Sequence, residues 1–338
     1  MNNRFIKMKC EICGNETYTI TIPICPSCAR TEKALKYIRT LHEGVDKIHG
    51  EGMGKCKLCS NECGFNDKGL CGLKIVEDNK LKSLVTSNVA ILSCYEDPLP
   101  TNCCNSWFCK GSNLKGTNLA VFYYGCNFDC LYCQNWSHKF ISEKNKVTVD
   151  EMVKKAMPER VKCICHFGGS PEPQLPFAIK FSKEVLKRRE IMICWEWNGA
   201  GKKNLVLKAA KLSYESEGTV KFDLKAWNPY LHQILTGRSN EETLRNFERI
   251  FDKYPEVLSA TTLLVPYYVD EKEVEGIAKF LASLSDEIPY SLLIFHPDFR
   301  LSDMPITPKR QVFKCYEVAK KYLKKVHIGN IHLLAWSS

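Results

Sequence analysis

Residues 119–135 read Leu-Ala-Val-Phe-Tyr-Tyr-Gly-Cys-Asn-Phe-Asp-Cys-Leu-Tyr-Cys-Gln-Asn. The apolar first part, 119–124, predicts a buried strand. The loop that follows carries Cys126, Cys130 and Cys133, so one short segment supplies three thiolates. Three ligands on a four-iron cluster leave the fourth iron open to substrate, much as catalytic metal sites keep one position free. The alternative is a zinc loop whose fourth ligand lies elsewhere in the chain.

The composition favours a metal-binding protein of a reducing compartment. The chain has 338 residues, enough for a large α/β domain with an appendage, and its 19 cysteines fall mostly in pairs. The polar, basic residues 1–9 do not resemble a signal peptide, and no apolar run is long enough for a membrane span. We therefore expect a cytoplasmic protein, and an anaerobic host because open clusters react with oxygen. The formal charge of +10 comes from scattered lysines, which favours a solvated exterior over an RNA-binding surface.

The spacing of glycines and cysteines predicts three regions, 1–45, 46–115 and 116–338. In the first region, the pairs Cys10/Cys13 and Cys25/Cys28 are typical of a zinc-ribbon or rubredoxin-like site for zinc or iron. Such a site either replaces a hydrophobic core as a structural element or serves as a docking or nucleic-acid knuckle. A short amphipathic helix is expected over 31–43, before a glycine-rich linker.

The second region holds two further cysteine groups. Cys56, Cys59, Cys63 and Cys71 are interleaved with glycines and predict either zinc or an additional closed iron–sulfur cluster. The less regular group is Cys94, Cys103, Cys104 and Cys109, for which metal binding and buried free thiols are equally open.

The third region alternates between two patterns. Apolar runs predict strands at 119–124, 161–166, 190–195, 219–224, 258–265, 289–295 and 326–331. Helical patterns separate most of them, at 148–156, 174–189, 202–211, 240–254, 270–284 and 308–325. This alternation predicts a parallel α/β sheet, and six or seven units suit a partial (β/α)6-type barrel of the TIM-barrel kind, with its chemistry at the carboxyl ends of the strands.

Polar residues follow several of these strands. They are Gly168, Gly169 and Glu172 after the second strand, Glu196 and Asn198 after the third, Asp223 and Lys225 after the fourth, and His296 after the sixth. Asp223 and Lys225 are two positions apart on a strand and point the same way, which predicts either an ion-paired polar site or a structural salt bridge. Asn198 with Gly199 is also compatible with a simple turn, and a lone histidine is often structural. Cys163, Cys165, Cys194 and Cys315 lie in apolar contexts and are interpreted as small buried residues.

Residues 119–330 resemble the radical S-adenosylmethionine (SAM) superfamily, in particular its pyruvate formate-lyase activating enzyme-like branch. The resemblance rests on 125–135, 222–225, 232–240 and 296–298, and the AmmeMemoRadiSam-system radical SAM proteins are similar in the same places and in 56–71. It implies a 4Fe-4S cluster on Cys126, Cys130 and Cys133. It also implies SAM contacts by Gly168, Gly169 and Glu172, although Ser170 and Pro171 interrupt the family's Gly-Gly-Glu-Pro segment here.

The same resemblance assigns the remaining polar residues to SAM. Glu196, Asn198, Asp223, Lys225 and His296 are candidate contacts, and Tyr132 is either an adenine contact or a core aromatic residue.

The implied activity is reductive cleavage of SAM to a 5′-deoxyadenosyl radical, which abstracts hydrogen from a substrate. Its electron donor would be a ferredoxin or flavodoxin. The favoured substrate is a glycyl radical enzyme, which makes this chain an activase. Modification of RNA or of a small molecule is the second hypothesis. A non-enzymatic iron–sulfur or zinc scaffold is the third, and Gly168, Gly169, Asp223 and Lys225 argue against it because a scaffold needs no SAM contacts.

Overall fold

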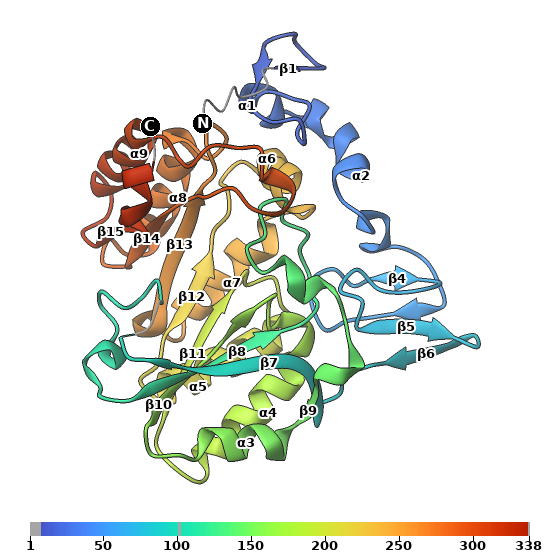
Figure 1. Cartoon of the computed structure of the whole chain (residues 1–338), viewed down its shortest axis with the longest axis vertical. Coiled ribbons are helices and arrows are strands. Elements are labelled where there is room, and N and C mark those ends of the chain that lie inside the picture. The colour runs from blue at the N-terminus through green and yellow to red at the C-terminus, as the bar shows by residue number, and fades with distance from the viewer. Residues whose placement is uncertain (1–7, 101–102, 337–338) are drawn as a thin grey trace.

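A nine-stranded sheet forms the centre of the computed structural model, which describes residues 8–100 and 103–336 (Figure 1). The sheet order is β15-β14-β13-β12-β11-β10-β8-β7-β9. The strands are β7 (Val89–Pro98), β8 (Thr117–Tyr123), β9 (Lys146–Thr148), β10 (Val161–Gly168), β11 (Met192–Trp197), β12 (Val220–Asp223), β13 (Leu258–Leu264), β14 (Tyr290–Ile294) and β15 (Val326–Gly329).

The seven strands predicted from the sequence are the seven parallel strands of this sheet, β8 and β10 to β15. The sequence did not predict β7 and β9. β7 pairs antiparallel with β8, and β9 pairs antiparallel with β7 at the edge of the sheet. These nine strands thus form one open α/β sheet with an antiparallel edge, and its closure into a partial barrel stays a prediction.

The predicted helices are present with small changes at their ends. They are α3 (Val149–Ala156), α4 (Leu175–Leu186), α5 (Lys203–Glu215), α7 (Glu241–Phe251), α8 (Glu271–Leu284) and α9 (Lys309–Lys320). A further helix, α6 (Pro229–Thr236), was not predicted. Asn228 caps it by accepting hydrogen bonds from the next free backbone N–H groups, and Pro229 occupies the first helical position, where its missing N–H costs nothing.

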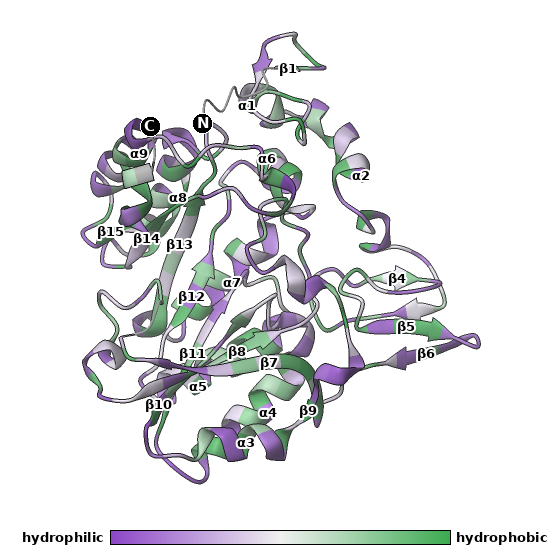
Figure 2. Cartoon of the chain, viewed as in Figure 1, coloured by the Kyte–Doolittle hydropathy of each residue, from purple (hydrophilic) through white to green (hydrophobic). Residues whose placement is uncertain are grey.

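One face of the parallel sheet packs on these helices. The indole N–H of Trp195 donates to the carbonyl of Ala209 in α5, and His166 is hydrogen bonded to Ser182 in α4 at 2.9 Å. Because side chains alternate along a strand, the neighbours of Trp195 and His166 face the other side, where the cavity described below lies. In Figure 2, β8 is largely hydrophobic, whereas α3 carries both hydrophilic and hydrophobic residues, as expected for a helix with one buried face.

Short elements make up the N-terminal part, which runs along the outside of the sheet domain (Figure 1). They are β1 (Met8–Lys9), β2 (Glu16–Thr17), α1 (Pro26–Ala29), α2 (Ile38–Leu41) and the hairpin strands β3 (Gly54–Lys55), β4 (Gly64–Phe65), β5 (Lys74–Glu77) and β6 (Lys80–Ser83). The helix expected over 31–43 is a 3-10 helix, Glu32–Tyr37, that continues into α2.

This N-terminal part shares the main hydrophobic core. Ile22, Ile24 and Ala29 are fully buried in the same cluster as the sheet. Arg30 fixes the contact by donating to Glu273 at 2.7 Å and to the carbonyl of Tyr268 at 2.7 Å. The division into three regions stays a prediction.

In residues 8–100 and 103–336, every helix is too short or too polar to cross a lipid bilayer. Residues 1–7, on which the expectation about a signal peptide largely rests, lie outside the described residues.

Candidate active site and metal centres

A cavity of about 360 Å³ lies at the carboxyl ends of the central parallel strands. Cys126, Cys130 and Cys133 line it together. Of the other predicted site residues, the cavity wall contains Tyr132, Gly168, Gly169, Glu196, Asn198, Asp223 and Lys225. Residues from the loops after β8, β10, β11 and β12 therefore meet in one place, as expected for a parallel sheet.

Gly125 sets the direction of the cysteine loop as the chain leaves β8. Its φ of +74° lies in the left-handed region, and a Cβ there would sit 2.5 Å from the backbone oxygen of Cys71. Only glycine fits both conditions. The turn places Cys126 at the cavity immediately afterwards.

The three cysteines are partly buried, and this affects the protonation of their thiols. Burial raises the pKa of Cys126 and Cys133 above the usual range and raises that of Cys130 to about 12, because a thiolate is poorly solvated there. The positive charges of Lys225 and Lys139 favour the thiolate and lower the pKa of Cys130, in opposition to burial. A bound metal is the strongest means of holding such thiols as thiolates.

A charged network supports the cysteine loop from behind. Asp129 is bound by Lys139, by His42 Nδ1 at 3.0 Å and by Arg300 at 3.1 Å. Burial opposes ionisation of Asp129, but the hydrogen bond from His42 and the charges of Lys139 and Arg300 outweigh it and lower its pKa to about 2. Asp129 is thus a stable anion that ties the loop to the N-terminal part and to the segment after β14.

Gly168 and Gly169 let the backbone pass close to β8. Gly168 has a φ of +102°, and a Cβ on it would sit 2.5 Å from the Cα of Phe122. A Cβ on Gly169 would sit 2.6 Å from the carbonyl oxygen of Tyr123. Only glycine at these two positions permits so close an approach to β8 beside the cavity.

Asn198 connects three of the loops. It donates to Asn127 Oδ1 at 2.7 Å and to Ser170 Oγ at 3.0 Å, and its amide lies 3.9 Å from the sulfur of Cys126. These contacts favour a site residue over a simple turn at Asn198.

Glu172 does not reach the cavity. It is fully buried, and its Oε1 accepts a hydrogen bond from the backbone N–H of Gly199 at 2.7 Å, while Oε2 has no partner. Burial raises its pKa to about 7, because the hydrogen bonds from Ser170 and Gly199 offset only part of the desolvation. The carboxylate supports the turn that follows Asn198, and the SAM contact that the family resemblance implies for Glu172 stays a prediction.

A chain of ion pairs crosses the cavity wall from β11 to the loop after β12. Lys221 contacts Glu196 at 2.8 Å and Asp223 at 3.1 Å, and Lys225 contacts Asp223 at 2.9 Å. Burial disfavours charge on Asp223, but Lys221 and Lys225 outweigh it and lower its pKa to about 2. Asp223, Lys221 and Lys225 are therefore held charged beside the cavity. The expected pairing of Asp223 with Lys225 is present.

Tyr132 and His296 occupy different positions. Tyr132 is buried at the cavity wall, and its hydroxyl has no hydrogen-bond partner. His296 is only partly buried and does not line the cavity. Its Nε2 lies 2.9 Å from the amide of Gln134, a cavity residue, so it positions the rim.

The segment 103–114 covers the amino ends of the strands. Asn105 bonds to Thr219 at the start of β12 and to Ser259 in β13, and Trp107 donates to Ser291 in β14, all at 3.0 Å. This segment brings Cys104 to the cavity wall. It also brings Cys103 to 3.0 Å from Glu196.

Two members of the irregular cysteine group have different neighbours, and metal binding by this group stays open. Cys94 lies 3.9 Å from the sulfur of Met152, away from Cys103 and its partner Glu196. Cys163, Cys165, Cys194 and Cys315 are buried, as expected. Cys165 also lies 3.6 Å from Glu196, a contact that the sequence did not indicate.

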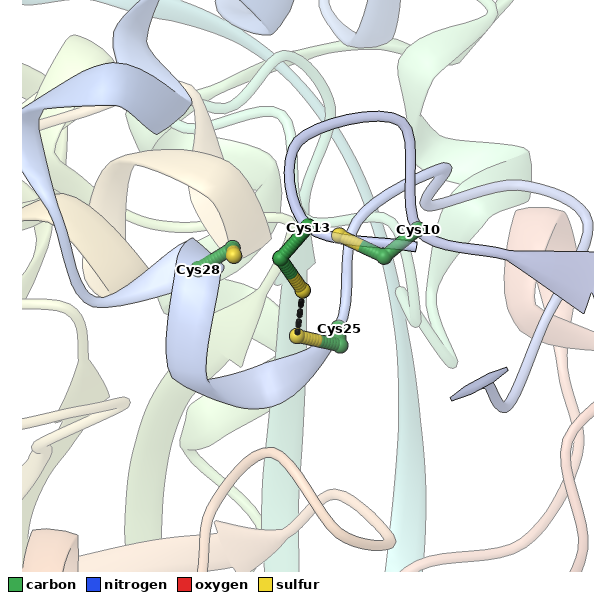
Figure 3. A group of neighbouring side chains, drawn as sticks. All are labelled: Cys10, Cys13, Cys25 and Cys28. Atoms are coloured by element: carbon green, nitrogen blue, oxygen red, sulfur yellow. Dashed lines mark hydrogen bonds between the residues drawn. The ribbon is translucent and has the colours of Figure 1, made fainter. Parts of the chain in front are cut away.

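The N-terminal cysteines form a compact group. The sulfurs of Cys10, Cys13, Cys25 and Cys28 all lie within 4.8 Å of one another, and those of Cys13 and Cys25 are 3.6 Å apart (Figure 3). Four thiolates around one zinc ion with Zn–S bonds of about 2.3 Å would be about 3.8 Å apart. This group can therefore hold a single metal ion.

Cys56, Cys59, Cys63 and Cys71 line a second, small pocket whose wall is mostly apolar. They gather around it from the two turns beside β3 and β4.

Sequence reasoning missed several residues of the active site. Lys221 and Ser170 line the cavity, and Asn127 binds Asn198. Lys221 is two positions before Asp223 on β12, so period-two alternation could have found it. Asn127 lies inside the cysteine run and could have been included for that reason. The contact of Lys139 with Asp129 had no signal in the sequence.

The chain is similar to several known proteins. Residues 120–281 match the Radical SAM superfamily. A protein of Methanocaldococcus jannaschii named as a glycyl-radical enzyme activating enzyme is 29% identical over 213 residues, which cover 62% of this chain and 79% of that protein. The pyruvate formate-lyase-activating enzyme of Staphylococcus aureus (strain USA300) is 31% identical over 193 residues, covering 54% and 75%. A solved domain of a pyruvate-formate lyase-activating enzyme from Bacteroides vulgatus ATCC 8482 aligns with a TM-score of 0.42 at 22% identity, covering 50% and 99%.

The chain belongs to the radical SAM superfamily, whose members are iron–sulfur enzymes that use SAM. Within it, the chain falls in the pyruvate formate-lyase activating enzyme-like branch. The donor set fits these cofactors. One loop offers three partly buried thiols, the two glycines bring their backbone close to β8 at the cavity wall, and the buried hydroxyl of Tyr132 lacks a partner.

Proposed function

We propose that this enzyme is an activase that removes a hydrogen atom from a partner protein, a glycyl radical enzyme. The observation that carries the proposal is the meeting of Cys126, Cys130 and Cys133 with Gly168, Gly169 and Asn198 around one cavity. Its relatives at about 30% identity carry the names of activating enzymes, which supports a protein as the substrate.

In this proposal the three cysteines hold a 4Fe-4S cluster. Together, the cluster and SAM supply a one-electron cleavage that permits hydrogen abstraction from an unactivated C–H bond. Lys139 and Lys225 stabilise the thiolates by their positive charge. Asn198 holds the loop of Cys126 against the loop of Ser170, so that cluster and SAM keep a fixed geometry.

The glycines and the ion-pair chain would bind the rest of SAM. The backbone at Gly168 and Gly169 can accept the amino group of the methionine part. Lys225, charged and held by Asp223, would face its carboxylate, and Glu196 and Asp223 would receive the ribose hydroxyls. Tyr132 would donate its free hydroxyl within the same cavity. We further propose that the open sheet curves around SAM as a partial barrel.

The electron comes from a small iron–sulfur or flavin protein of the ferredoxin or flavodoxin class. The compact N-terminal group would hold zinc as a structural ion, because its four sulfurs match the spacing of a single tetrahedral ion.

The proposal is tested with anaerobically reconstituted protein, SAM and a chemical reductant, with 5′-deoxyadenosine measured as the product. The wild-type protein should form the nucleoside, and Cys130→Ala should abolish its formation while keeping the N-terminal metal. Cys315→Ala, which removes a buried thiol in α9 far from the cavity wall, is the control and should keep activity. Nucleoside formation by Cys130→Ala would contradict the assignment of the loop.

The identity of the substrate is tested separately. With a glycyl radical enzyme from the same organism as the partner, the characteristic glycyl doublet should appear in electron paramagnetic resonance spectra. Cleavage of SAM with no radical on any such partner would contradict the activase while leaving the radical SAM chemistry intact.

A further inference from the structure

The second cysteine group, Cys56, Cys59, Cys63 and Cys71, differs from the N-terminal group in the distances between its sulfur atoms. In the described part of the chain, only Cys10, Cys13, Cys25 and Cys28 bring three or more ligand atoms within 4.8 Å of one another. Cys56, Cys59, Cys63 and Cys71 do not, although they line one pocket. Cys126, Cys130 and Cys133 share this wider spacing. A single zinc ion needs sulfurs about 3.8 Å apart, whereas an iron–sulfur cluster lies between its thiolates and separates them.

A partly buried cation lies beside these thiols. Arg238, just after α6, donates to Ser60 Oγ at 3.4 Å, and its Nε is buried without a partner. Among the described residues, no carboxylate lies within ion-pair distance of its guanidinium group. A guanidinium group without a counterion is costly inside a protein, and a metal–thiolate centre with net negative charge would balance it.

The pocket of the second cysteine group is in direct contact with the loop that carries Cys126. Asn61, between Cys59 and Cys63, donates to the carbonyl of Asn127 at 2.8 Å. The backbone oxygen of Cys71 lies against Gly125, whose missing Cβ would come within 2.5 Å of it. The residues on both sides of Cys126 are therefore in contact with the ligand loops of the second group.

We propose that Cys56, Cys59, Cys63 and Cys71 hold a second iron–sulfur cluster that passes electrons to the cluster on Cys126, Cys130 and Cys133. This inference rests on the proposed function only in requiring a cluster at those three cysteines. One electron leaves the external iron–sulfur or flavin protein, which is oxidised. The accessory cluster is reduced and then reoxidised as the electron moves on to the SAM cluster.

The first test is the metal content of the full chain reconstituted without oxygen. The wild-type protein should contain about eight iron ions and one zinc ion, and Cys59→Ser/Cys63→Ser should lose about half of the iron. The same variant should keep the change that SAM causes in the electron paramagnetic resonance spectrum of the remaining cluster. About four iron ions with two zinc ions in the wild-type protein would overturn the proposal.

The second test concerns the electron path and does not require loss of a ligand. Arg238→Met should shift the reduction potential of the accessory cluster to a lower value, because a positive charge beside a cluster favours its more negative, reduced state. Lys57→Met, an exposed lysine in the same turn, is the matched control and should shift it much less. Equal potentials in wild type and Arg238→Met would contradict the assigned contact.

Kinetics distinguish a relay from a structural cluster. With a protein reductant, Cys59→Ser/Cys63→Ser should cleave SAM at least tenfold more slowly than wild type, whereas a small chemical reductant should support similar rates in both. Equal slowing with both reductants would overturn the relay. Failure of the glycyl radical assay would leave iron content and potentials unchanged, so the two proposals fail separately.

Discussion

At the scale of single residues, Glu172 shows how burial determines the role of a group. The sequence suggests that it contacts SAM, but the structure places it beneath the cavity wall, where it accepts from the N–H of Gly199. Its buried Oε2 has no hydrogen-bond partner. The ionised carboxylate is therefore poorly solvated there, and the neutral acid is lower in free energy.

The raised pKa of Glu172 predicts a stability that depends on pH. With a value of about 7 in the folded protein against 4.5 in the unfolded chain, the folded state binds the proton more tightly. The stability contributed by Glu172 is therefore complete below pH 4.5, falls as the pH rises, and reaches its minimum above pH 7. The loss amounts to about 3 kcal/mol.

Glu172→Gln should remove this dependence, because an amide does not ionise and can still accept from Gly199. Urea unfolding under anaerobic conditions at several pH values gives the free energy of unfolding. Relative to wild type, this free energy should increase for the variant between pH 4.5 and pH 7. Glu190→Gln, which changes an exposed glutamate, serves as the control for the loss of one carboxylate. A free-energy difference between Glu172→Gln and wild type that stays constant over this range would contradict the buried, proton-binding role.

At the scale of elements, the turns after β8 and β10 build the cavity, and each depends on a glycine. Gly168 has a φ of +102°, and a Cβ on this residue would collide with the backbone of Phe122. An added methyl group would meet rigid main chain and not a movable side chain.

Gly168→Ala should therefore weaken SAM binding at least tenfold, or about 1.4 kcal/mol, by pushing the turn away from β8. Equilibrium dialysis of the reconstituted protein against labelled SAM measures this effect. Gly14→Ala is matched in conformation, with a φ of +76°, but has open space around its Cβ, so SAM binding should be unchanged. Similar affinities for Gly168→Ala and wild type would show that the turn does not shape the SAM site.

The same scale shows what sequence patterns can predict. The parallel strands are apolar on the helix-packed face and short, so their periodicity is clear. β7 escaped prediction because it is half exposed and ends in Glu96, Asp97 and Pro98, and β9 because it has three residues. α6 was missed because Asn228-Pro229, which resembles a turn, is here a helix cap.

The candidate site was predictable where ligands lie close together in sequence. Cys126, Cys130 and Cys133 were found this way. Contacts across the sheet, such as Lys221 with Glu196, depend on strand register, and a single sequence does not give that register.

At the scale of the whole molecule, ion pairs and hydrogen bonds fasten the first residues of the N-terminal part to the catalytic region. Arg30 pairs with Glu273 and Asp270 at α8, and His42 binds Asp129 in the cysteine loop. The metal group of Cys10 to Cys28 lies beside the first of these contacts, since Arg30 follows α1 directly.

Cys28→Ser should weaken metal binding there and loosen residues 10–41. Hydrogen–deuterium exchange should show faster exchange in this segment, with little change in β10 to β13. One zinc ion should be lost, and the iron at Cys126 should remain. Cys315→Ser, a buried thiol outside the metal groups, is the control. Unchanged exchange in residues 10–41 would show that the metal does not hold this part.

The segment 103–114, which covers the amino ends of β12 to β14, has a consequence for kinetics. Since it closes that end of the sheet, SAM and a partner protein would both enter from the carboxyl end. A docked partner would then block exchange of the small molecule beneath it. We expect ordered addition, with SAM first and the protein second, and slow escape of methionine and nucleoside until the partner leaves.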